Sequence, residues 1–240
     1  FMSSITSETA LVRDGYSFFP KEFSLDAYGF IVDNASNVFR AYGITIFVTV
    51  VGTAINLAMS ALLAYPLSLK NLPGRRILSF YIFFTMLFNG GLVPTYLMYT
   101  GIFHINNTLL AYIVPGFLMS AMNVMLIRTF FANSIPDALF EAAQIDGASQ
   151  FQIFGKIVLP LGKPILVAMG LLSGLGYWND WTNGLYYIRD TQLYGIQNLL
   201  NKMITDLTAL TQNASGASTT AIADIPSASV RMAIAFVAML

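Results

Sequence analysis

Few residues of this chain could carry out chemistry on their own. The 240 residues include no cysteine and one histidine, His104, so there is no thiolate nucleophile, no thiolate metal ligand and no Ser/His/Asp arrangement. The chain also lacks G-x-x-x-x-G-K-[ST], the loop that cradles nucleotide phosphates. The sequence therefore predicts no catalytic residues, no metal site and no cofactor held by this chain.

A polar, alanine-rich stretch, EAAQIDGASQFQIFGKIVLPLGKP, interrupts the long apolar runs. Just before it, Ser134 and Asp137 match a capping box, which predicts a helix with Ser134 as its N-cap. Pro136 suits the first turn of that helix, where its missing N–H removes no hydrogen bond. Alanines favour the helix as far as Asp146, and Gly147 is a natural left-handed stop.

A second short helix is predicted beyond this glycine elbow, because Ser149 and Gln152 repeat the capping pattern. Phe151, Phe154 and Val158 then recur at i, i+3 and i+7, which predicts that they share one apolar face. An exposed face of this kind either docks in a groove of a partner or lies on the bilayer interface. The residues alone leave both interpretations open.

The elements around this stretch are those of a bilayer protein. Apolar residues make up 56% of the chain and charged residues 10%, against about 25% charged in soluble domains. The twelve basic and twelve acidic residues balance, which argues against nucleic acid as a partner. Four segments are long enough to cross the hydrocarbon as helices. They lie at 41–69, 77–99, 108–131 and 164–188.

The ends of the chain predict a piece of a longer protein. It begins with Phe1, and a fifth apolar segment begins near Ile225 and is cut off at Leu240. We therefore expect a first membrane helix and most of the last one to be absent. Residues 1–40 are mixed in character and are predicted to form an extracytoplasmic approach to the membrane.

Basic residues predict the orientation, because lysine and arginine favour the cytoplasmic side. The connector KNLPGRR and the stretch from Arg128 to Lys163 are basic, whereas residues 101–107 contain neither type. The polar stretch is thus expected inside and residues 101–107 outside. Residues 188–224 then lie outside too, and their part TQNASGASTTA is predicted to be a flexible loop.

Polar residues within the apolar segments are candidates for a substrate path. Asn56, Asn89 and Asn123 could each line a path or hydrogen-bond helices together. The two glycines and the proline that follow Asn89 could free backbone carbonyls or form a closely packed kink. The residues alone do not separate these alternatives.

The motif GYWNDW holds both tryptophans of the chain. Trp178 and Trp181 could belong to an aromatic belt at the membrane interface, or could stack on sugar faces while Asn179 and Asp180 bind hydroxyls. Asp180 is the only acid within the long apolar runs. A secondary transporter would need a relay of intramembrane charges, and Asp180 alone does not supply one.

The polar stretch resembles the EAA signature of binding-protein-dependent ABC importer permeases, in which E-A-A is followed by a glycine and later by I-x-L-P. All the fixed positions are present: Glu141, Ala142, Ala143, Gly147, Ile157, Leu159 and Pro160. Over essentially its whole length the chain is similar to the carbohydrate-uptake group, such as the second permease of the maltose system. Within that group it resembles the permeases for lipo- or uronic-acid-containing oligosaccharides.

The resemblance implies an all-α, polytopic membrane bundle of the type I importer permease fold, with a six-helix core. Residues 1–240 would form one transmembrane domain, with the coupling loop at about 134–163. Glu141 would pair with a basic ATPase residue, Gly147 would form the elbow, and Phe151 and Phe154 would fill a cleft of the ATPase. Ala142, Ala143 and Asp146 would complete this coupling site.

The resemblance also implies the partners. The chain would be the non-catalytic half of a heterodimeric pore, with a second homologous permease, in a bacterial cell membrane. Two ATPase subunits would hold ATP and Mg, and an extracytoplasmic solute-binding protein would deliver an oligosaccharide. The same architecture could instead carry a peptide or another solute.

Overall fold

The computed structural model describes residues 35–116 and 118–214, with shorter pieces at 2–7, 10, 15, 17, 22–25, 28–29, 229–230 and 232–233. The described residues are helical and include no β-strand, only an isolated bridge between Thr6 and Phe23. The predicted all-α fold class is therefore confirmed. The chain divides into two compact units, one formed by 46–187 and the other by 1–45 with 188–240.

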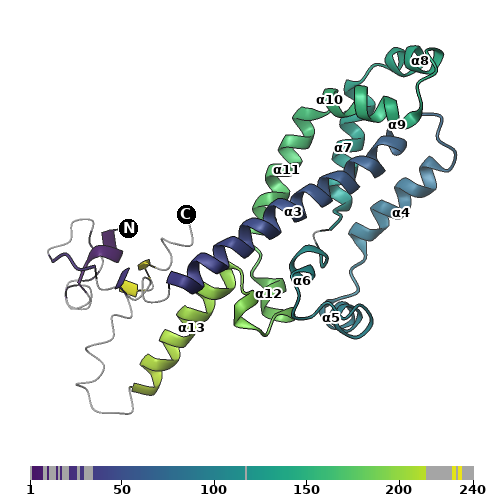
Figure 1. The fold of residues 1–240 in the computed structure, drawn as a ribbon. Coiled ribbons are helices and arrows are strands. Elements are labelled where there is room, and N and C mark those ends of the chain that lie inside the picture. The colour runs from purple at the N-terminus through teal and green to yellow at the C-terminus, as the bar shows by residue number, and fades with distance from the viewer. Residues whose placement is uncertain are drawn as a thin grey trace. The chain divides into compact units, whose positions relative to one another are not determined.

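The helices follow one another along the chain as labelled in Figure 1. They are η1 Met2–Ile5, α3 Ala35–Ser68, α4 Arg75–Leu87, α5 Leu92–Leu97, η2 Met98–Ile102, α6 Leu110–Ile113, α7 Ala121–Ser134, α8 Asp137–Ile145, α9 Gln150–Ile153, η3 Phe154–Val158, α10 Leu159–Leu161, α11 Lys163–Trp178, α12 Thr182–Tyr187, η4 Thr191–Leu193 and α13 Ile196–Ala214. The segments η2 and η3 are π-helical turns.

The first predicted membrane segment, 41–69, is confirmed as a continuous helix. Its helix, α3, has 34 residues and is long and apolar enough to cross a bilayer alone. Pro66 lies in its last turn, where few further hydrogen bonds are lost. The Ser68 hydroxyl donates to the carbonyl of Tyr65 at 2.6 Å, which satisfies one of the free carbonyls of this end.

The apolar segment 77–99 is interrupted at the position where the two glycines and the proline after Asn89 were expected to loosen or kink a helix. The helix α4 ends at Leu87, and the pair α5–η2 continues after a bend of 110°. The side chain of Asn89 accepts a hydrogen bond from the N–H of Gly91 at 2.9 Å and holds the turn between them. Asn89 and its neighbours therefore form a break in the segment rather than a mild kink.

Two further segments are also interrupted. Within 108–131 the helix α6 stops at Ile113, because Pro115 has no N–H to continue it, and Ser120 caps the start of α7. Within 164–188 the helix α11 ends at Trp178, where Asn179 is the C-cap. Two helix pairs are sharply bent, namely α4 with α5–η2 and the stretch α9–α10 with α11. If each of these pairs counts as one span, up to three spans are present among the described residues.

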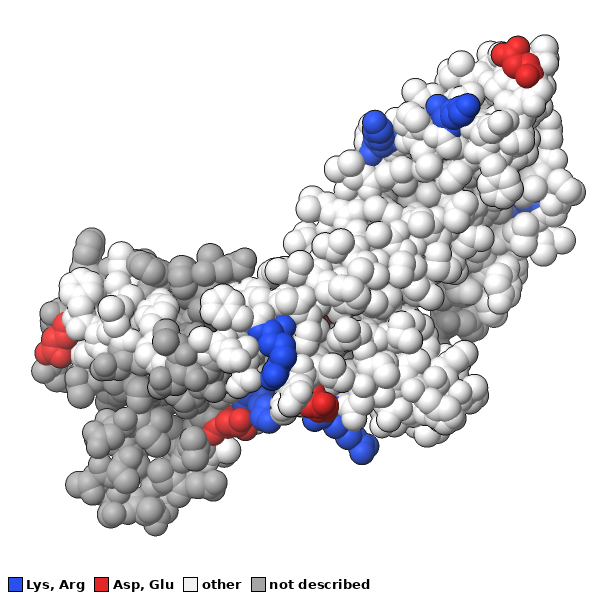
Figure 2. Space-filling view, in the orientation of Figure 1, with Lys and Arg blue, Asp and Glu red and all other residues white. Residues whose placement is uncertain are grey.

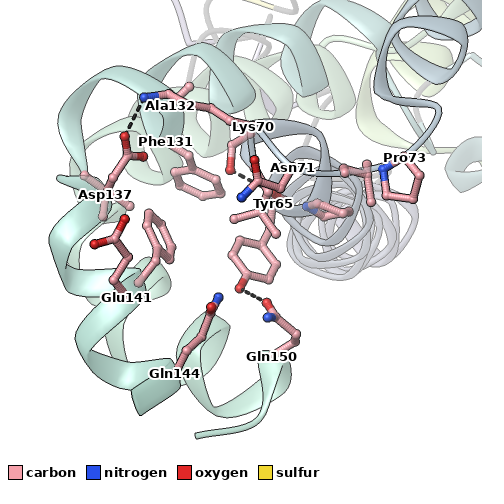
Figure 3. Close-up of a pocket in the computed structure, with 16 residues that line it drawn as sticks. Tyr65, Lys70, Asn71, Pro73, Phe131, Ala132, Asp137, Glu141, Gln144 and Gln150 are labelled. Atoms are coloured by element: carbon pink, nitrogen blue, oxygen red, sulfur yellow. Dashed lines mark hydrogen bonds and ion pairs between the residues drawn. The ribbon is translucent and has the colours of Figure 1, made fainter. Parts of the chain in front are cut away.

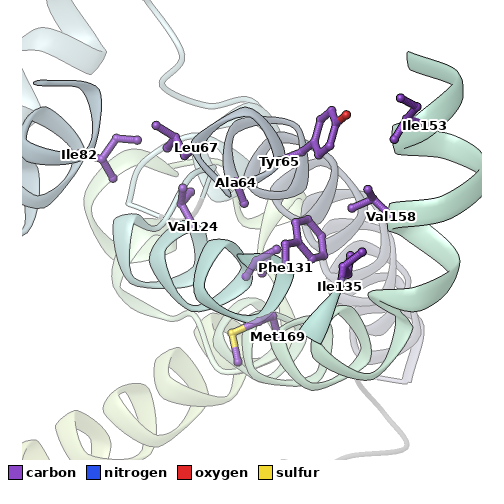
Figure 4. Packing of buried hydrophobic residues seen from close by; sticks show 11 residues of the cluster. Ala64, Tyr65, Leu67, Ile82, Val124, Phe131, Ile135, Ile153, Val158 and Met169 are labelled. Atoms are coloured by element: carbon purple, nitrogen blue, oxygen red, sulfur yellow. The ribbon is translucent and has the colours of Figure 1, made fainter. Parts of the chain in front are cut away.

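The buried core of the 46–187 unit lies where α3, α7 and the η3–α11 region meet (Figure 4). Val124, Ile127 and Phe131 of α7 are fully buried at helical spacing, and Ala64 of α3 faces the same cluster. In Figure 1, α8, α9 and α10 lie together at one end of this unit, and α5, α6 and α12 at the other. Figure 2 shows few charged side chains on the visible surface between these ends.

Close approach of α3 and α11 depends on a small residue. A β-carbon built at Gly52 would lie 2.6 Å from the ring of Tyr177, closer than any real contact. The Tyr177 hydroxyl then donates to the carbonyl of Ile113 at 3.2 Å. Tyr177 thus connects α3, α6 and α11, and its position requires that residue 52 has no side chain.

The second unit contains a helix that the sequence did not predict. Residues 188–224 were expected outside the membrane, with a flexible loop only at TQNASGASTTA, and α13 covers Ile196–Ala214. Ile196, Leu200 and Met203 are buried at amphipathic spacing, against Val38 and Ala41 at the start of α3. The remainder of the predicted flexible loop and most of the fifth apolar segment lie outside the described residues.

Candidate coupling site

The polar stretch folds as two short helices joined by a glycine elbow. Gly147 has φ of 76°, a left-handed conformation that a β-carbon disfavours. Its N–H donates to the carbonyl of Gln144 at 3.0 Å, and the next N–H, of Ala148, donates to Ala143 at 2.9 Å. These bonds close the end of α8, so the predicted left-handed stop is confirmed.

The second predicted cap is also confirmed, at the start of α9. The N–H of Ser149 donates to the Gln152 side chain at 2.8 Å, and the N–H of Gln152 donates to the Ser149 hydroxyl at 3.4 Å. This reciprocal pair is a capping box. The direction in which α9 leaves the elbow is therefore fixed by local hydrogen bonds.

The first predicted cap is wrong, because Ser134 is the last residue of α7. Pro136 disfavours the helical conformation for the residue before it, so Ile135 is extended, with φ of −106° and ψ of 115°. The Ile135 side chain is buried in the core. The helix α8 consequently starts at Asp137, with Pro136 as an N-cap that makes no side-chain hydrogen bond.

The elbow exposes three large apolar side chains. Ile145 and Phe151, on either side of Gly147, are 86% and 81% exposed, and Leu139 of α8 is 41% exposed. Glu141, Ala142 and Asp146 are exposed as well, whereas Ala143 is half-buried against the core. We call Leu139, Ile145 and Phe151 the elbow patch. It combines exposed apolar side chains with two nearby carboxylates, those of Glu141 and Asp146.

The prediction that Phe151, Phe154 and Val158 share one face is wrong. Val158 and Ile153 are buried, while Phe151 is exposed. The reason is the π-helical turn η3, in which residues five apart, such as Ile153 and Val158, lie on the same side. The Phe154 ring lies 5.3 Å from the ring of Tyr65, so Phe154 faces the interior of the 46–187 unit rather than the surface of the elbow.

A pocket of about 650 Å³ lies beneath the elbow, between α8 and the connector that follows α3 (Figure 3). Glu141 and Gln144 line it from α8. The Tyr65 hydroxyl donates to the Gln150 side-chain oxygen at 2.6 Å across the pocket. An exposed ion pair joins Lys70 of the connector to Asp137. Both contacts tie the elbow to α3 and its connector.

These anchoring residues were missed by sequence reasoning. Lys70 was noted only as an orientation signal, and Gln150 only as part of the motif. Tyr65 sits in an apolar run beside Pro66, and nothing local distinguishes it from other interior aromatic residues. Only the fold brings it within hydrogen-bonding distance of a residue 85 positions away.

Two of the candidate path residues meet in the helix interior. The Asn123 amide donates to the Asn56 oxygen at 3.3 Å and to the Ser173 hydroxyl at 2.9 Å, and Ser173 donates to Asn56 at 3.1 Å. Asn56 is 2% exposed. This triad joins α3, α7 and α11, a geometry that fits the alternative in which these residues hydrogen-bond helices together rather than line a path. Asn89, by contrast, is exposed at the break after α4.

The residues of the GYWNDW motif lie at the junction of α11 and α12. The Asp180 carboxylate accepts from the backbone and side chain of Asn183 at 3.1 and 2.8 Å, which caps α12. Asn179 is exposed and donates to the Leu175 carbonyl at 2.9 Å. Trp181 is 45% exposed. Asp180 therefore has a local structural role, whatever else it contacts.

Trp178 of this motif lines a groove. The groove, of about 560 Å³, lies between α3 and α11 and is mostly apolar. Thr49 and Thr53 of α3 also line it, and their hydroxyls are buried without a hydrogen-bond partner among the described residues. Because these hydroxyls are themselves buried, the groove presents a ligand with the Trp178 ring and a mostly apolar lining.

Interrupted apolar helices with an anchored, exposed elbow define a polytopic membrane transport subunit. Residues 56–240 match the family described as binding-protein-dependent transport system inner membrane component. The chain belongs to this family and is a permease component of an ABC importer, without a catalytic role. Importers of this family generally combine a partner permease, an ATPase that uses ATP, and a solute-binding protein.

Two relatives and one solved structure show what this chain is similar to. The chain is 37% identical to Protein LplC of Bacillus subtilis over 86% of its length and 69% of the relative. It is 36% identical to the polygalacturonan/rhamnogalacturonan transport system permease YtcP of the same organism, over 84% and 69%. A bacterial ABC transporter involved in the import of the acidic polysaccharide alginate superposes with a TM-score of 0.81 at 31% identity, over 100% of this chain and 85% of that one.

Proposed function

We propose that this chain is the membrane-spanning subunit of an ATP-driven, binding-protein-dependent oligosaccharide importer. Support for the cargo comes from relatives named for polygalacturonan, rhamnogalacturonan and alginate transport. These polymers are rich in uronic acids, so an acidic oligosaccharide is the cargo that we favour. A peptide or another solute on the same architecture is the alternative that the experiment below separates.

The observation that carries the coupling proposal is the exposure of Ile145 and Phe151 on both sides of a fixed elbow. Large apolar side chains exposed on a rigid helix pair are suited to a groove on a partner protein. The carboxylates of Glu141 and Asp146 flank them and suit basic residues at the edge of that groove. We assign the partner as the ATPase, with Ala142 and Gly147 completing the contact.

Within this proposal Phe154 and Ala143 support the elbow from inside. Phe154 packs on Tyr65, and Tyr65 holds Gln150, the first residue of α9. When ATP binding closes two ATPase subunits, a displacement of the elbow would pass through these contacts to α3. The helices then rock between inward-open and outward-open arrangements, and hydrolysis resets them. The chemistry stays on the ATPase, which holds ATP and Mg.

The substrate path is assigned from the exposed and groove-lining residues of the candidate set. We propose that Trp178 contacts the sugar, because its ring lines the groove between α3 and α11, where it could stack on a sugar face. Asn89, Asn179 and Trp181 are exposed on this chain and could face a second, homologous permease across the pore. Asn56 and Asn123 would instead hold the helices in register.

We also propose how this chain lies in the membrane and which subunits assemble with it. Residues 1–240 would form a single transmembrane domain that crosses a bacterial cell membrane several times, with the elbow inside and residues 101–107 outside. One copy of this chain and one homologous permease would form the pore, above two ATPase subunits. An extracytoplasmic binding protein would deliver the cargo.

The test is performed on the complete importer, in liposomes, with its binding protein. ATP hydrolysis is measured with a panel of neutral oligosaccharides, uronic-acid oligosaccharides and peptides. We expect stimulation by uronic-acid oligosaccharides and weaker or no stimulation by the others. Stimulation by peptides alone, in a complex that binds ATP, would replace the cargo proposal and keep the architecture.

A further inference from the structure

A second pocket at the same end of the 46–187 unit is strongly basic. It has a volume of about 800 Å³ and is lined by the connector after α3, the first turn of α4 and one residue of α7. Four of its eight lining residues are cations: Lys70, Arg75, Arg76 and Arg128. We call these eight residues the basic pocket. Neither the coupling proposal nor the path proposal uses it.

Two of the guanidinium groups donate hydrogen bonds to the same backbone carbonyl oxygen. Arg75 Nε donates to the carbonyl oxygen of Leu67 at 2.9 Å, and Arg128 Nε donates to the same oxygen at 3.1 Å. Each group uses only its Nε in this bond, so its terminal amino groups stay free to bind a ligand. Two like charges so close repel one another, and a bound anion would relieve that repulsion.

The positive charges of these arginines are not balanced by carboxylates among the described residues. Among the described residues, no carboxylate pairs with Arg75, Arg76 or Arg128, and the one ion pair at the pocket is that of Lys70 with Asp137. Ser79 also lines the pocket, and its buried hydroxyl has no hydrogen-bond partner among the described residues. Arginines that are held in place and have no carboxylate partner among the described residues are suited to bind a phosphate group.

The helix α4, which begins at this pocket, exposes an apolar surface that starts at the pocket. Ile77, which lines the pocket, is 75% exposed, and Phe80, Tyr81 and Phe84 of α4 are 64%, 67% and 41% exposed. An acidic protein surface would match the cations but would not explain this face. A phosphate that carries hydrocarbon chains would match both, because its chains could lie along α4.

We propose that the basic pocket binds the headgroup of an anionic phospholipid, with its phosphate against Arg75, Arg76 and Arg128 and its acyl chains along α4. The inference rests on the membrane location of the family, and it is independent of the cargo and of the ATPase contact. A failure of either of those proposals would leave it unchanged.

The test places a fluorophore at the pocket in the complete importer, reconstituted in phosphatidylcholine with a minor fraction of phosphatidylglycerol. Ile77→Cys is labelled with a small fluorophore in a complex whose other subunits lack cysteine, since this chain has none. Bromine, which quenches on contact, is carried either by the phosphatidylglycerol or by an equal amount of phosphatidylcholine. The lipid composition is thus the same in both arms.

We expect brominated phosphatidylglycerol to quench the label at Ile77 several-fold more strongly than brominated phosphatidylcholine. A label at Leu172→Cys, which is 58% exposed on α11 and does not line the groove of Trp178, should show no preference. The double variant Arg75→Gln/Arg128→Gln should lose the preference at Ile77. The matched variant Lys156→Gln/Lys163→Gln removes two exposed cations that do not line the pocket, and it should keep the preference.

Equal quenching by the two lipids at Ile77 in the otherwise unchanged complex would overturn the proposal, and this arm does not depend on the arginine variants folding. Persistence of the preference in the arginine variant would overturn it too. If inorganic phosphate abolishes the preference, the pocket is a site for free anions. If the arginine variant loses the ATPase while quenching is unchanged, the pocket contacts an acidic protein surface instead.

Discussion

Tyr65 near the end of α3 donates a hydrogen bond to Gln150 at the start of α9, at 2.6 Å. The tyrosine is 7% exposed, and its ring packs on Phe154. The bond therefore joins a long membrane helix to the helix that follows the elbow. A contact that links these two elements is a candidate route for motion between the ATPase and the pore.

Tyr65→Phe removes this bond and keeps the ring packed on Phe154. We expect assembly to be unchanged and the ratio of ATP hydrolysed to cargo transported to rise, because α9 is held less firmly by about 1 kcal/mol. Both rates are measured in proteoliposomes. Gln150→Leu should have the same effect, and the double variant should add nothing further. Fully additive effects would show that the two residues act separately.

Gly147→Pro should uncouple ATP hydrolysis from transport. Proline fixes φ near −65°, whereas residue 147 has φ of 76°, and proline also removes the N–H that donates to Gln144. Gly147→Asn is the matched control, since asparagine tolerates the left-handed conformation and should retain most of the coupling. Cargo-stimulated hydrolysis and uptake are measured together. Normal coupling in the proline variant would rule out the elbow as the lever.

Phe151→Asp should release the ATPase from the membrane subunits. Phe151 is 81% exposed and carries no internal packing, so the change should leave the chain folded. A buried apolar anchor in an interface is worth about 2 kcal/mol or more, which corresponds to roughly 30-fold in affinity. Co-purification of the ATPase measures the loss. Phe151→Leu should bind nearly normally, and intact binding of the aspartate variant would refute the docking proposal.

Asn123→Ala should destabilise the chain, because it leaves Asn56 and Ser173 without their shared partner. Hydrogen bonds between membrane helices contribute about 0.6 kcal/mol on average and about 1.7 at most, so a modest fall in the thermal unfolding midpoint is expected. Asn89→Ala, at an exposed position, should change stability by less than about 0.5 kcal/mol. An unchanged midpoint with a raised KM for the cargo would instead make Asn123 a path residue.

Local signals in the sequence predicted the elbow well. The left-handed glycine and the Ser149–Gln152 cap depend only on residues within a few positions of each other, so their geometry follows from the local pattern. Ser134 failed as a cap because Pro136 acts on the residue before it and Ile135 finds a place in the core. A capping pattern states what a helix could use, and tertiary burial decides where the helix starts.

Features that depend on distant residues were not predictable. Mean hydropathy over a long window gives the extent of an apolar segment but not the sharpness of breaks such as those at Asn89 and Pro115, so the large bend after α4 was not predicted. The partner of Tyr65 and the triad around Asn56 come from positions more than sixty residues away. The helix α13 was missed because its apolar face is narrow and its remaining residues are polar. Phe154 faces the interior because of a π-helical turn, and no short sequence pattern indicates such a turn.

The break between α6 and α7 also bears on how the chain enters the membrane during synthesis. The four-residue helix α6 is too short to insert by itself, and its Ala111, Tyr112 and Ile113 are all buried by protein. Irregular backbone at membrane depth is tolerated only where protein surrounds it. The helix α3 can leave the insertion machinery alone, but the segment that contains α6 must wait for its neighbours. We therefore expect α3 to insert into the membrane by itself and the later segments to insert together.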